Sequence, residues 1–494
     1  MEDETILTGR EAQRRIVDSA IFVSDRVRST LGPLGMDKML TDRLGNRTLT
    51  NDGASILKAL PTTDPIALEM IGIAKAQEQK AFDGTTSVII KSAEMLKNAD
   101  LLIDENVHPT KITKGYREGM NIAVAAAEAK AVEYDPYEAA KKVATTAMTG
   151  KTAGGYSELL ADICAKAANC SKPQNIKIVG LNGDLNNTEL IDGVAVIKEP
   201  CLSGMPTKVE GSILLVDEEL GPPMANMSLT DPSKIAEIAK VQEQYIKERI
   251  AYILELDVKA VFCQKGIDSR AQQAFRREGI MAFRNIKKGD IHRLATSTGA
   301  SIVEDLADIR EDDIGSGKVE FIENMSKSYT KVEGTVSGAA SIILPCPTEQ
   351  TLQEISRALE DAIGVAWIVA NEPKLVTGAG TIQTQMYQAI VNSEPMKDSK
   401  AEAAKQAFAK SLLIIPKTLA ESAGMDIMDS MHELLTGKDL GINALEGSVS
   451  SMSVVEPLEI VKSALQSATE CVVGLLRTDE IVLSRPIQEL FEDY

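Results

Sequence analysis

The sequence is poor in the residues that build metal clusters, disulfide frameworks and stacking surfaces. Only three histidines occur among 494 residues, and the six cysteines include no CxxC pair. Neither a disulfide framework nor a zinc site is expected, and the thiols are expected to be small buried side chains in a reducing compartment. Aromatic residues amount to 4% with one tryptophan, which argues against a surface for stacking bases or sugars.

Basic charge and long apolar runs are scarce as well. The formal net charge of −19 argues against a nucleic-acid partner. We find no signal peptide and no apolar run of membrane-spanning length, so we expect a cytoplasmic protein without a membrane partner. Hydrophobic residues make up 44% of the chain, and its 494 residues exceed what one core usually serves, so two or three domains are expected.

Two short acidic turns stand out in what the sequence does contain: residues 50–53 (TNDG) and residues 82–87 (FDGTTS). In the second, Asp83 offers a hard carboxylate oxygen for Mg²⁺, and Gly84 lets the backbone approach closely. The apolar spacing of residues 88–96 predicts that a helix begins there. Hydroxyl and N–H groups at that helix start come from Thr85, Thr86 and Ser87. We interpret the two turns as halves of one Mg-nucleotide site.

Each turn also has a plainer interpretation. Asp83 fits an ordinary helix N-cap, and for this motif alone the two interpretations have about equal weight. Asp52 stands before Gly53, a pair that is common in ordinary turns. Neither motif by itself decides between a nucleotide site and a turn.

The start of the chain predicts a helix followed by a Gly-rich loop. Thr8 and Glu11 fit a capping box, and apolar residues recur at helical spacing as far as Leu31. In residues 31–40, two glycines around a proline end the helix and leave backbone bare enough for a phosphate or ribose. Residues 47–57 then predict a strand, a turn, and a second strand or helix start.

The middle of the chain alternates between β-rich runs and helical stretches, the pattern of an α/β domain. The strands are expected at residues 212–216, 260–264, 281–284 and 301–303, and the helices at 269–278 and 288–297. Residues 220–227 form an apolar-speckled excursion, and Asp231 and Pro232 then open a charged helix that reaches about residue 256. Helix-breaking stretches at residues 204–206 and 345–347 flank this domain like hinges.

Several motifs in a fixed order resemble those of a known family. Residues 31–40, 50–57 and 83–87 closely resemble the nucleotide motifs of the group II chaperonins, which comprise the archaeal thermosome and the eukaryotic cytosolic chaperonin. The likeness continues at residues 108–109, 114–116, 264–268, 358–362, 415–424 and 455–458. Because it runs almost end to end in a fixed order, this resemblance is far more specific than any one motif.

The resemblance implies an α+β multidomain fold of three parts. A mostly helical equatorial domain would bind the nucleotide, a small intermediate domain would act as a hinge, and an inserted α/β apical domain would bind substrate. The implied boundaries are 1–134 and 379–494 for the equatorial domain, 135–203 and 346–378 for the intermediate domain, and 204–345 for the apical domain. A helical protrusion of the apical domain, at about residues 220–256, would form a built-in lid.

The resemblance also implies roles for individual residues. Asp361 would align the attacking water, Asp52 would lie near the γ-phosphate and its solvent, and Asp83 would bind Mg²⁺. The residues implied to contact ATP are Leu31, Gly32, Pro33, Gly53, Gly84, Thr85, Thr86, Ser87, Lys151, Gly378, Gly380 and Glu456. Without the resemblance, Asp361 beside Glu360 reads as a solvated helix face and Lys151 as a solvated charge.

Two positions depart from the family pattern. Phe82 stands where the family usually has glycine, and residues 377–383 (TGAGTIQ) carry Ala379 at the second of three family glycines. We expect Phe82 to add bulk beside the phosphates, and the methyl group of Ala379 to crowd the nucleotide or forbid a positive φ. Both changes predict slower hydrolysis or weaker nucleotide binding. The segment before Asp231 is also a few residues shorter than the family pattern.

The resemblance thus predicts an ATP-dependent protein-folding chaperonin subunit with ATP and Mg²⁺ as cofactors. Its partners would be non-native proteins, and identical or paralogous subunits in two stacked rings of about eight subunits each. The alternative is a divergent, weakly or non-hydrolysing subunit that acts as a structural partner in a mixed ring. Phe82 and Ala379 favour that alternative, and the three carboxylates oppose it. A small-molecule phosphotransferase would need a second substrate pocket, for which the sequence has no motif.

Overall fold

The computed structural model describes residues 5–41, 45, 47–149, 156–221, 244, 246–306, 309–324, 327–336 and 338–483, and the structural statements below concern these residues. The chain divides into two compact units, one of Met1–Ala165 with Arg357–Tyr494 and one of Lys166–Ser356. The boundaries expected for equatorial, intermediate and apical domains stay a prediction, because this division has two parts and its crossings lie at residues 165–166 and 356–357.

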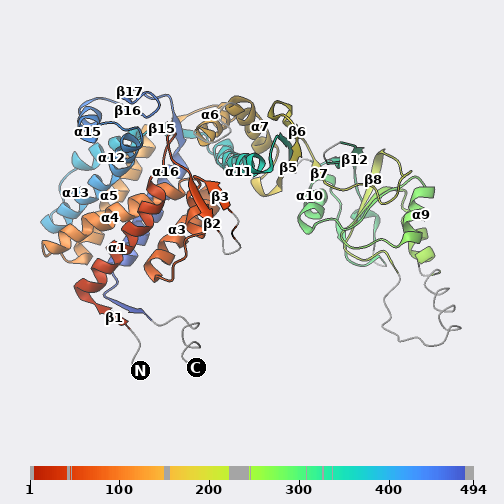
Figure 1. Cartoon of the computed structure of the whole chain (residues 1–494), viewed down its shortest axis with the longest axis horizontal. Helices are drawn as coiled ribbons and strands as arrows, with labels where there is room; N and C mark the ends of the chain where they lie inside the picture. The colour runs from red at the N-terminus through yellow and green to blue at the C-terminus, as the bar shows by residue number, and fades with distance from the viewer. Residues whose placement is uncertain are drawn as a thin grey trace. The chain divides into compact units, whose positions relative to one another are not determined.

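The first unit is mainly a bundle of helices (Figure 1). Helix α4 (Thr85–Asp104) packs against several of them, namely α1 (Gly9–Arg28), α3 (Pro65–Ala81), α13 (Ser399–Leu412) and α16 (Leu458–Leu476). Apolar residues recur along α4 at helical spacing, and Val88, Met95 and Leu96 are fully buried. Because α4 is buried along its length, its N-terminus has a fixed position in the unit.

Further helices complete the bundle and its edges. They are α2 (Gly53–Lys58), α5 (Pro109–Lys130), α6 (Pro136–Met148), α12 (Thr381–Val391), α14 (Ile414–Ser422) and α15 (Ile427–Thr436). Tyr116 of α5 donates to the Met95 carbonyl at 2.6 Å, and its ring lies edge-on to Phe408 of α13 at 5.5 Å. Two helices, α7 (Ser157–Cys170) and α11 (Glu349–Asn371), include residues assigned to both units.

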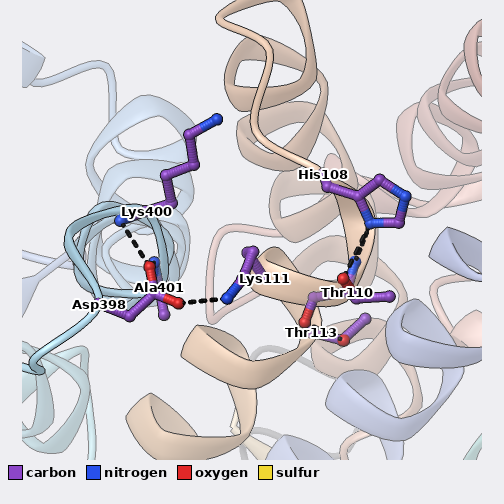
Figure 2. A network of polar contacts seen from close by, with 7 residues as sticks. All are labelled: His108, Thr110, Lys111, Thr113, Asp398, Lys400 and Ala401. Carbon is purple, nitrogen blue, oxygen red and sulfur yellow. Dashed lines mark hydrogen bonds and ion pairs between the residues drawn. The ribbon is translucent and has the colours of Figure 1, made fainter.

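The N-termini of α5 and α13 meet at one polar contact (Figure 2). His108 caps α5, its Nδ1 accepting the N–H of Thr110 at 3.2 Å. Asp398 caps α13 by accepting the N–H of Lys400, also at 3.2 Å. Lys111 of α5 donates to the Asp398 carboxylate at 2.6 Å, so the two helix starts are tied together.

The first unit also contains short strands. Antiparallel pairs join β1 (Thr5–Thr8) to β19 (Glu480–Leu483), β2 (Lys38–Thr41) to β3 (Arg47–Thr50), and β16 (Gly441–Asn443) to β17 (Ser448–Ser450). A three-stranded sheet has the order β18 (Val455–Pro457), β15 (Lys374–Thr377), β4 (Val132–Glu133). This last sheet leads directly into the loop that precedes α12.

The second unit contains a seven-stranded sheet flanked by helices α9 (Ser269–Arg277) and α10 (Lys288–Thr298). Its strand order is β10 (Met281–Phe283), β9 (Val258–Cys263), β8 (Lys208–Val216), β12 (Gly315–Ile322), β13 (Tyr329–Gly334), β7 (Val194–Val196), and β11 (Ile302–Val303) also pairs with β8. Phe262 and Phe283 stack in its core at 4.6 Å. A smaller sheet has the order β5 (Ile176–Asn182), β14 (Ala340–Cys346), β6 (Glu189–Ile191).

The α/β character predicted for the middle of the chain is confirmed. The expected runs correspond to β8, β9, β10 and β11, and the two expected helices to α9 and α10. Of the expected lid, residues 222–243 and 245 lie outside the described residues, and residues 246–255 are helical. The expected hinge at residues 345–347 begins inside β14, where Pro345 and Cys346 pair with Leu181 and Asn182 of β5.

One local expectation for the start of the chain is wrong. Thr8 occupies the N-cap of α1 but makes no side-chain cap bond, so Thr8 and Glu11 form no capping box. Helix α1 ends at Arg28, and Leu31 lies in the loop that follows, as expected for residues 31–40. For residues 47–57, the structure chooses the helix start over the second strand, because Asp52 caps α2.

The thiols agree with the sequence analysis. All six cysteines are free, and Cys164, Cys263, Cys346 and Cys471 are buried. No helix within the described residues combines the length and the apolar character needed to cross a membrane.

Candidate nucleotide site

The turn that carries Asp83 joins the end of α3 to the start of α4. Phe82 terminates α3 in the left-handed region, with φ of 58°, and Gly84 precedes α4 with φ of 84°. The buried side-chain amide of Gln77 donates through Nε2 to the main-chain carbonyl of Asp83 at 3.0 Å, and the Ser463 hydroxyl of α16 donates to Oε1 of the same amide at 2.9 Å. The main chain of this turn is therefore held by a buried hydrogen-bond chain.

The Asp83 carboxylate is exposed and is not the N-cap of α4. Its Oδ1 accepts the N–H of Gly84 at 2.6 Å, and Gly84 itself takes the N-cap position without any side-chain bond. The plain N-cap interpretation of Asp83 is thus wrong. The first N–H groups of a helix have no acceptor within the helix, and here no side chain caps them. This leaves the start of α4, at Thr85, Thr86 and Ser87, suited to an anion.

The turn that carries Asp52 joins β3 to α2. The Asp52 carboxylate accepts the N–H of Ala54 at 3.2 Å and that of Ser55 at 2.9 Å, and the Asp52 N–H donates to Thr50 Oγ1 at 3.1 Å. The ordinary capping role of Asp52 is therefore real. Two carboxylate oxygens offer about four lone-pair directions, so the cap leaves acceptor capacity for a bound water.

The structure brings the two acidic turns together. A Cβ placed on Gly53 would lie 3.3 Å from Thr85 Oγ1 and would overlap Thr86 Oγ1. The absence of a side chain at Gly53 thus allows the start of α2 to touch the start of α4. Asp52 directly precedes Gly53, and Asp83 lies two residues before Thr85 and three before Thr86.

A third loop, between β15 and α12, supplies Gly378, Ala379 and Gly380. The Gly378 N–H donates to the Val454 carbonyl at 2.9 Å, and a Cβ at Gly378 would lie 2.8 Å from Oε1 of Glu456. Ala379 has φ of 56° and Gly380 has φ of 83°. The methyl group of Ala379 therefore does not prevent the positive φ, although such a conformation costs a non-glycine residue roughly 1 kcal/mol.

Glu456 and Lys91 are titratable residues that influence each other electrostatically, and the sequence analysis named only Glu456. Burial raises the pKa of Glu456, with Asp83 adding to the shift and Lys91 and the Ala379 N–H opposing it. Lys91 is 2% exposed, and burial lowers its pKa to about 8 against the opposing effect of Glu456. Lys91 was missed, although a lysine inside the apolar run of residues 88–96 is a readable signal.

The loop after α1 lies beside helix α4. Leu31 packs against the cluster that includes Ile90 of α4 and Leu419 of α14. Gly32 has φ of 87°, and a Cβ there would overlap the Leu419 side chain. The Gly35 N–H donates to the Gly32 carbonyl at 3.0 Å and closes the turn around Pro33. The first loop is thus fixed beside α4, whose N-terminus carries the threonines of the second motif.

Asp361 lies on α11 and is half-buried, whereas its neighbour Glu360 is exposed. One turn after Asp361, Gly364 contacts the side chain of Phe82. The bulk of Phe82 is therefore directed against α11, and its expected position beside the phosphates stays a prediction. Lys151 lies outside the described residues.

The donor set fits a magnesium nucleotide better than a metal held by protein alone. Within the described residues, no group of three or more His, Cys, Asp or Glu side chains is placed to hold a metal ion. Mg²⁺ is typically bound through one or two carboxylates together with substrate phosphates. Asp83 beside the start of α4 offers a carboxylate close to anion donors, which is compatible with that mode of binding.

The candidate site lies in the mainly helical unit, and the chain of that unit is interrupted by the α/β unit. Residues 23–486 match the TCP-1/cpn60 chaperonin family. Similar proteins include thermosome subunit beta of Archaeoglobus fulgidus, 36% identical over 97% of this chain and 93% of the relative, and the thermosome subunit of Methanocaldococcus jannaschii, 36% identical over 97% and 94%. Thermosome subunit alpha of Thermoplasma acidophilum is 36% identical over 97% and 92%.

The chain therefore belongs to the TCP-1/cpn60 chaperonin family. Its thermosome relatives place it among the group II chaperonins, as the sequence motifs predicted.

Proposed function

We propose that this chaperonin subunit binds and hydrolyses Mg-ATP at the site formed by the two acidic turns, and uses that cycle to fold proteins. The observation that carries the proposal is the contact of Gly53 with Thr86, which joins the Asp52 turn to the start of α4. A carboxylate for the metal, hydroxyl and N–H donors for phosphate, and a second carboxylate for the water side are thereby adjacent. Phosphoryl transfer requires little beyond such positioning and charge compensation.

Each residue has a definite task in this proposal. Asp83 holds the metal, which when bound neutralises charge on the phosphates. The start of α4 and the loop at Gly378 and Gly380 hold the nucleotide, together with Leu31, Gly32, Pro33, Lys151 and Glu456. Asp361 accepts a hydrogen bond from the attacking water and orients it, while Asp52 orders the solvent at the γ-phosphate.

The family relationship supports the remaining parts of the proposal. As a chaperonin subunit, the chain would assemble with itself or with paralogous subunits in two stacked rings of about eight subunits each. The second unit would bind non-native protein in the cytoplasm, and its lid at residues 220–256 would close on ATP binding. The relationship does not favour the alternative of a passive ring partner, since Asp52, Asp83 and Asp361 are all present.

The test uses the purified full chain and the variant Asp83→Ala. We expect a native mass of many subunits, and Mg²⁺-dependent ATP binding that the variant loses because it lacks a ligand of the ion. Nucleotide binding that is indifferent to Mg²⁺ in the parent protein would remove Asp83 from the site. A native mass of one subunit would overturn the ring assembly.

A further inference from the structure

Phe82 and Gly364 are each locally unfavourable in the structure. Phe82 has φ of 58°, in the left-handed region that is unfavourable for a residue with a side chain. Gly364 lies inside the long helix α11, where glycine is less favourable than alanine. Locally unfavourable features of this kind persist where the surrounding structure holds them in place.

The two residues fit each other. A Cβ placed on Gly364 would lie 2.6 Å from Cδ1 of Phe82 and closer still to its Cβ and Cγ. The Phe82 side chain therefore occupies the space left by the missing side chain of Gly364. It also packs against an apolar cluster built from α3, α6, α11, β15 and α16: Ala81, Ala139, Val143, Val365, Ile368, Val369, Leu375 and Ile460.

The chain neighbours of both residues belong to the candidate site. Phe82 is followed directly by Asp83, and Gly364 lies three residues after Asp361 on the same face of α11. One aromatic side chain thus links the main chain of the metal-binding turn to the helix that carries the proposed water-orienting carboxylate. On the other side of the turn, the Gln77 side chain holds the Asp83 carbonyl in place by a hydrogen bond. Because the turn is held in this way, a shift of the Phe82 side chain would displace α11.

We propose that Phe82 is a positioning residue for ATP hydrolysis: its side chain, seated on Gly364, fixes α11 against the turn of Asp83 and thereby sets the position of Asp361. The proposal rests on the proposed ATPase function. It differs from the expectation that Phe82 obstructs the nucleotide, and the two make opposite predictions for Phe82→Gly. A displacement of about 1 Å at a reacting group can lower a rate roughly hundredfold.

The experiment compares the assembled full chain with Phe82→Gly, Phe82→Leu, Gly364→Ala and the double variant Phe82→Gly with Gly364→Ala. Asn106→Gly is the matched control, because Asn106 also has a positive φ of 61° and lies at the other end of α4. For each protein, kcat for ATP, the Kd of a non-hydrolysable Mg-ATP analogue and the Tm are measured. The Kd and Tm separate positioning from nucleotide binding and from stability.

We expect Phe82→Gly to lower kcat roughly tenfold or more while the Kd changes less than about threefold. Phe82→Leu should restore much of the rate, because it returns an apolar side chain to the space beside Gly364. Gly364→Ala should lower kcat in the parent background, where its methyl group collides with Phe82. It should have little further effect beside Phe82→Gly, which is the coupling expected of residues in contact.

Several outcomes would overturn the role of Phe82. These are an unchanged or raised kcat in Phe82→Gly, a loss that appears only in the Kd, and additive effects of the two substitutions. If Phe82→Gly does not assemble, Phe82→Leu and Gly364→Ala still decide the matter, since both keep an apolar contact. A parent protein that does not hydrolyse ATP overturns the proposed function itself, which is a different result from an active parent with an indifferent Phe82.

Discussion

Gly53 touches Thr86, and this contact joins two sequence motifs that are more than one helix apart in the chain. Because a Cβ at Gly53 would overlap Thr86 Oγ1, only glycine lets the Asp52 turn approach the start of α4 this closely. A simple turn would not by itself explain the glycine after Asp52, whereas this contact does.

Gly53→Ala should therefore weaken Mg-ATP binding. The added methyl group must push the two turns apart, and overpacking of this kind costs about 1–3 kcal/mol, or roughly ten- to hundredfold in affinity. Gly72→Ala in α3 is the matched control, because a Cβ at Gly72 meets nothing within 4 Å. Titration calorimetry on both variants tests this. Equal affinities in the two variants would show that the contact does not shape the nucleotide site.

Asp361→Ala should abolish turnover and leave Mg-ATP binding largely intact. The proposed role of Asp361 is to orient water, and such a contact contributes to the transition state and not to the ground state. A single-turnover assay with bound nucleotide separates the two steps. Hydrolysis at the parent rate in this variant would remove Asp361 from the mechanism.

The lowered pKa of Lys91 predicts that the stability of the protein depends on pH in the alkaline range. Its pKa of about 8 lies below the ordinary value of 10.5, so between these pH values the unfolded chain holds a proton that the folded chain has released. Stability contributed by Lys91 therefore rises with pH across this window, by at most about 3 kcal/mol. We expect the Tm of Lys91→Met minus that of the parent to decrease from about pH 8 to about pH 10. A constant difference would contradict the buried, proton-releasing state of Lys91.

The contact between the starts of α5 and α13 predicts an effect in acid (Figure 2). The Lys111 ammonium, by its hydrogen bond, is the largest cause that holds the pKa of Asp398 below its ordinary value of 3.8. The stabilisation is thus complete above that ordinary value and is lost as the pH falls below it. Lys111→Met should lower the Tm at neutral pH, and the decrement should shrink as the pH falls below the ordinary pKa of 3.8.

Lys97→Met is the control for this acid effect, because Lys97 lies 3.8 Å from Glu94 on the surface of α4 and contacts no helix cap. Calorimetric scans over the pH range give the comparison. A decrement for Lys111→Met that persists unchanged in acid would contradict the contribution of Asp398.

Local signals in the sequence predicted much of the helical framework and of the site. The apolar spacing of residues 88–96 predicted α4, and the two acidic turns were interpreted as halves of one site. Both predictions rest on patterns among neighbouring residues. The choice between strand and helix after Asp52 depended on one capping interaction, which the sequence alone left open.

The remaining features depend on contacts between distant parts of the chain. The position of the Phe82 side chain depends on Gly364, which lies on another helix far along the sequence, so the contact of Phe82 with α11 could not be predicted from the neighbouring residues. The burial of Lys91 likewise depends on what packs around α4. Ala379 shows the converse, since its positive φ was anticipated as an obstacle and the backbone adopts it nevertheless.

The two acidic turns are proposed to form one magnesium-dependent ATP-hydrolysing site. The steady-state rate of ATP hydrolysis by the assembled chain tests this, measured with Mg²⁺, with excess chelator, and after Mg²⁺ is restored. We expect hydrolysis to stop when the chelator is added and to return with the metal. Absence of hydrolysis with Mg²⁺ present, or hydrolysis that continues without the metal, would contradict a magnesium-dependent site.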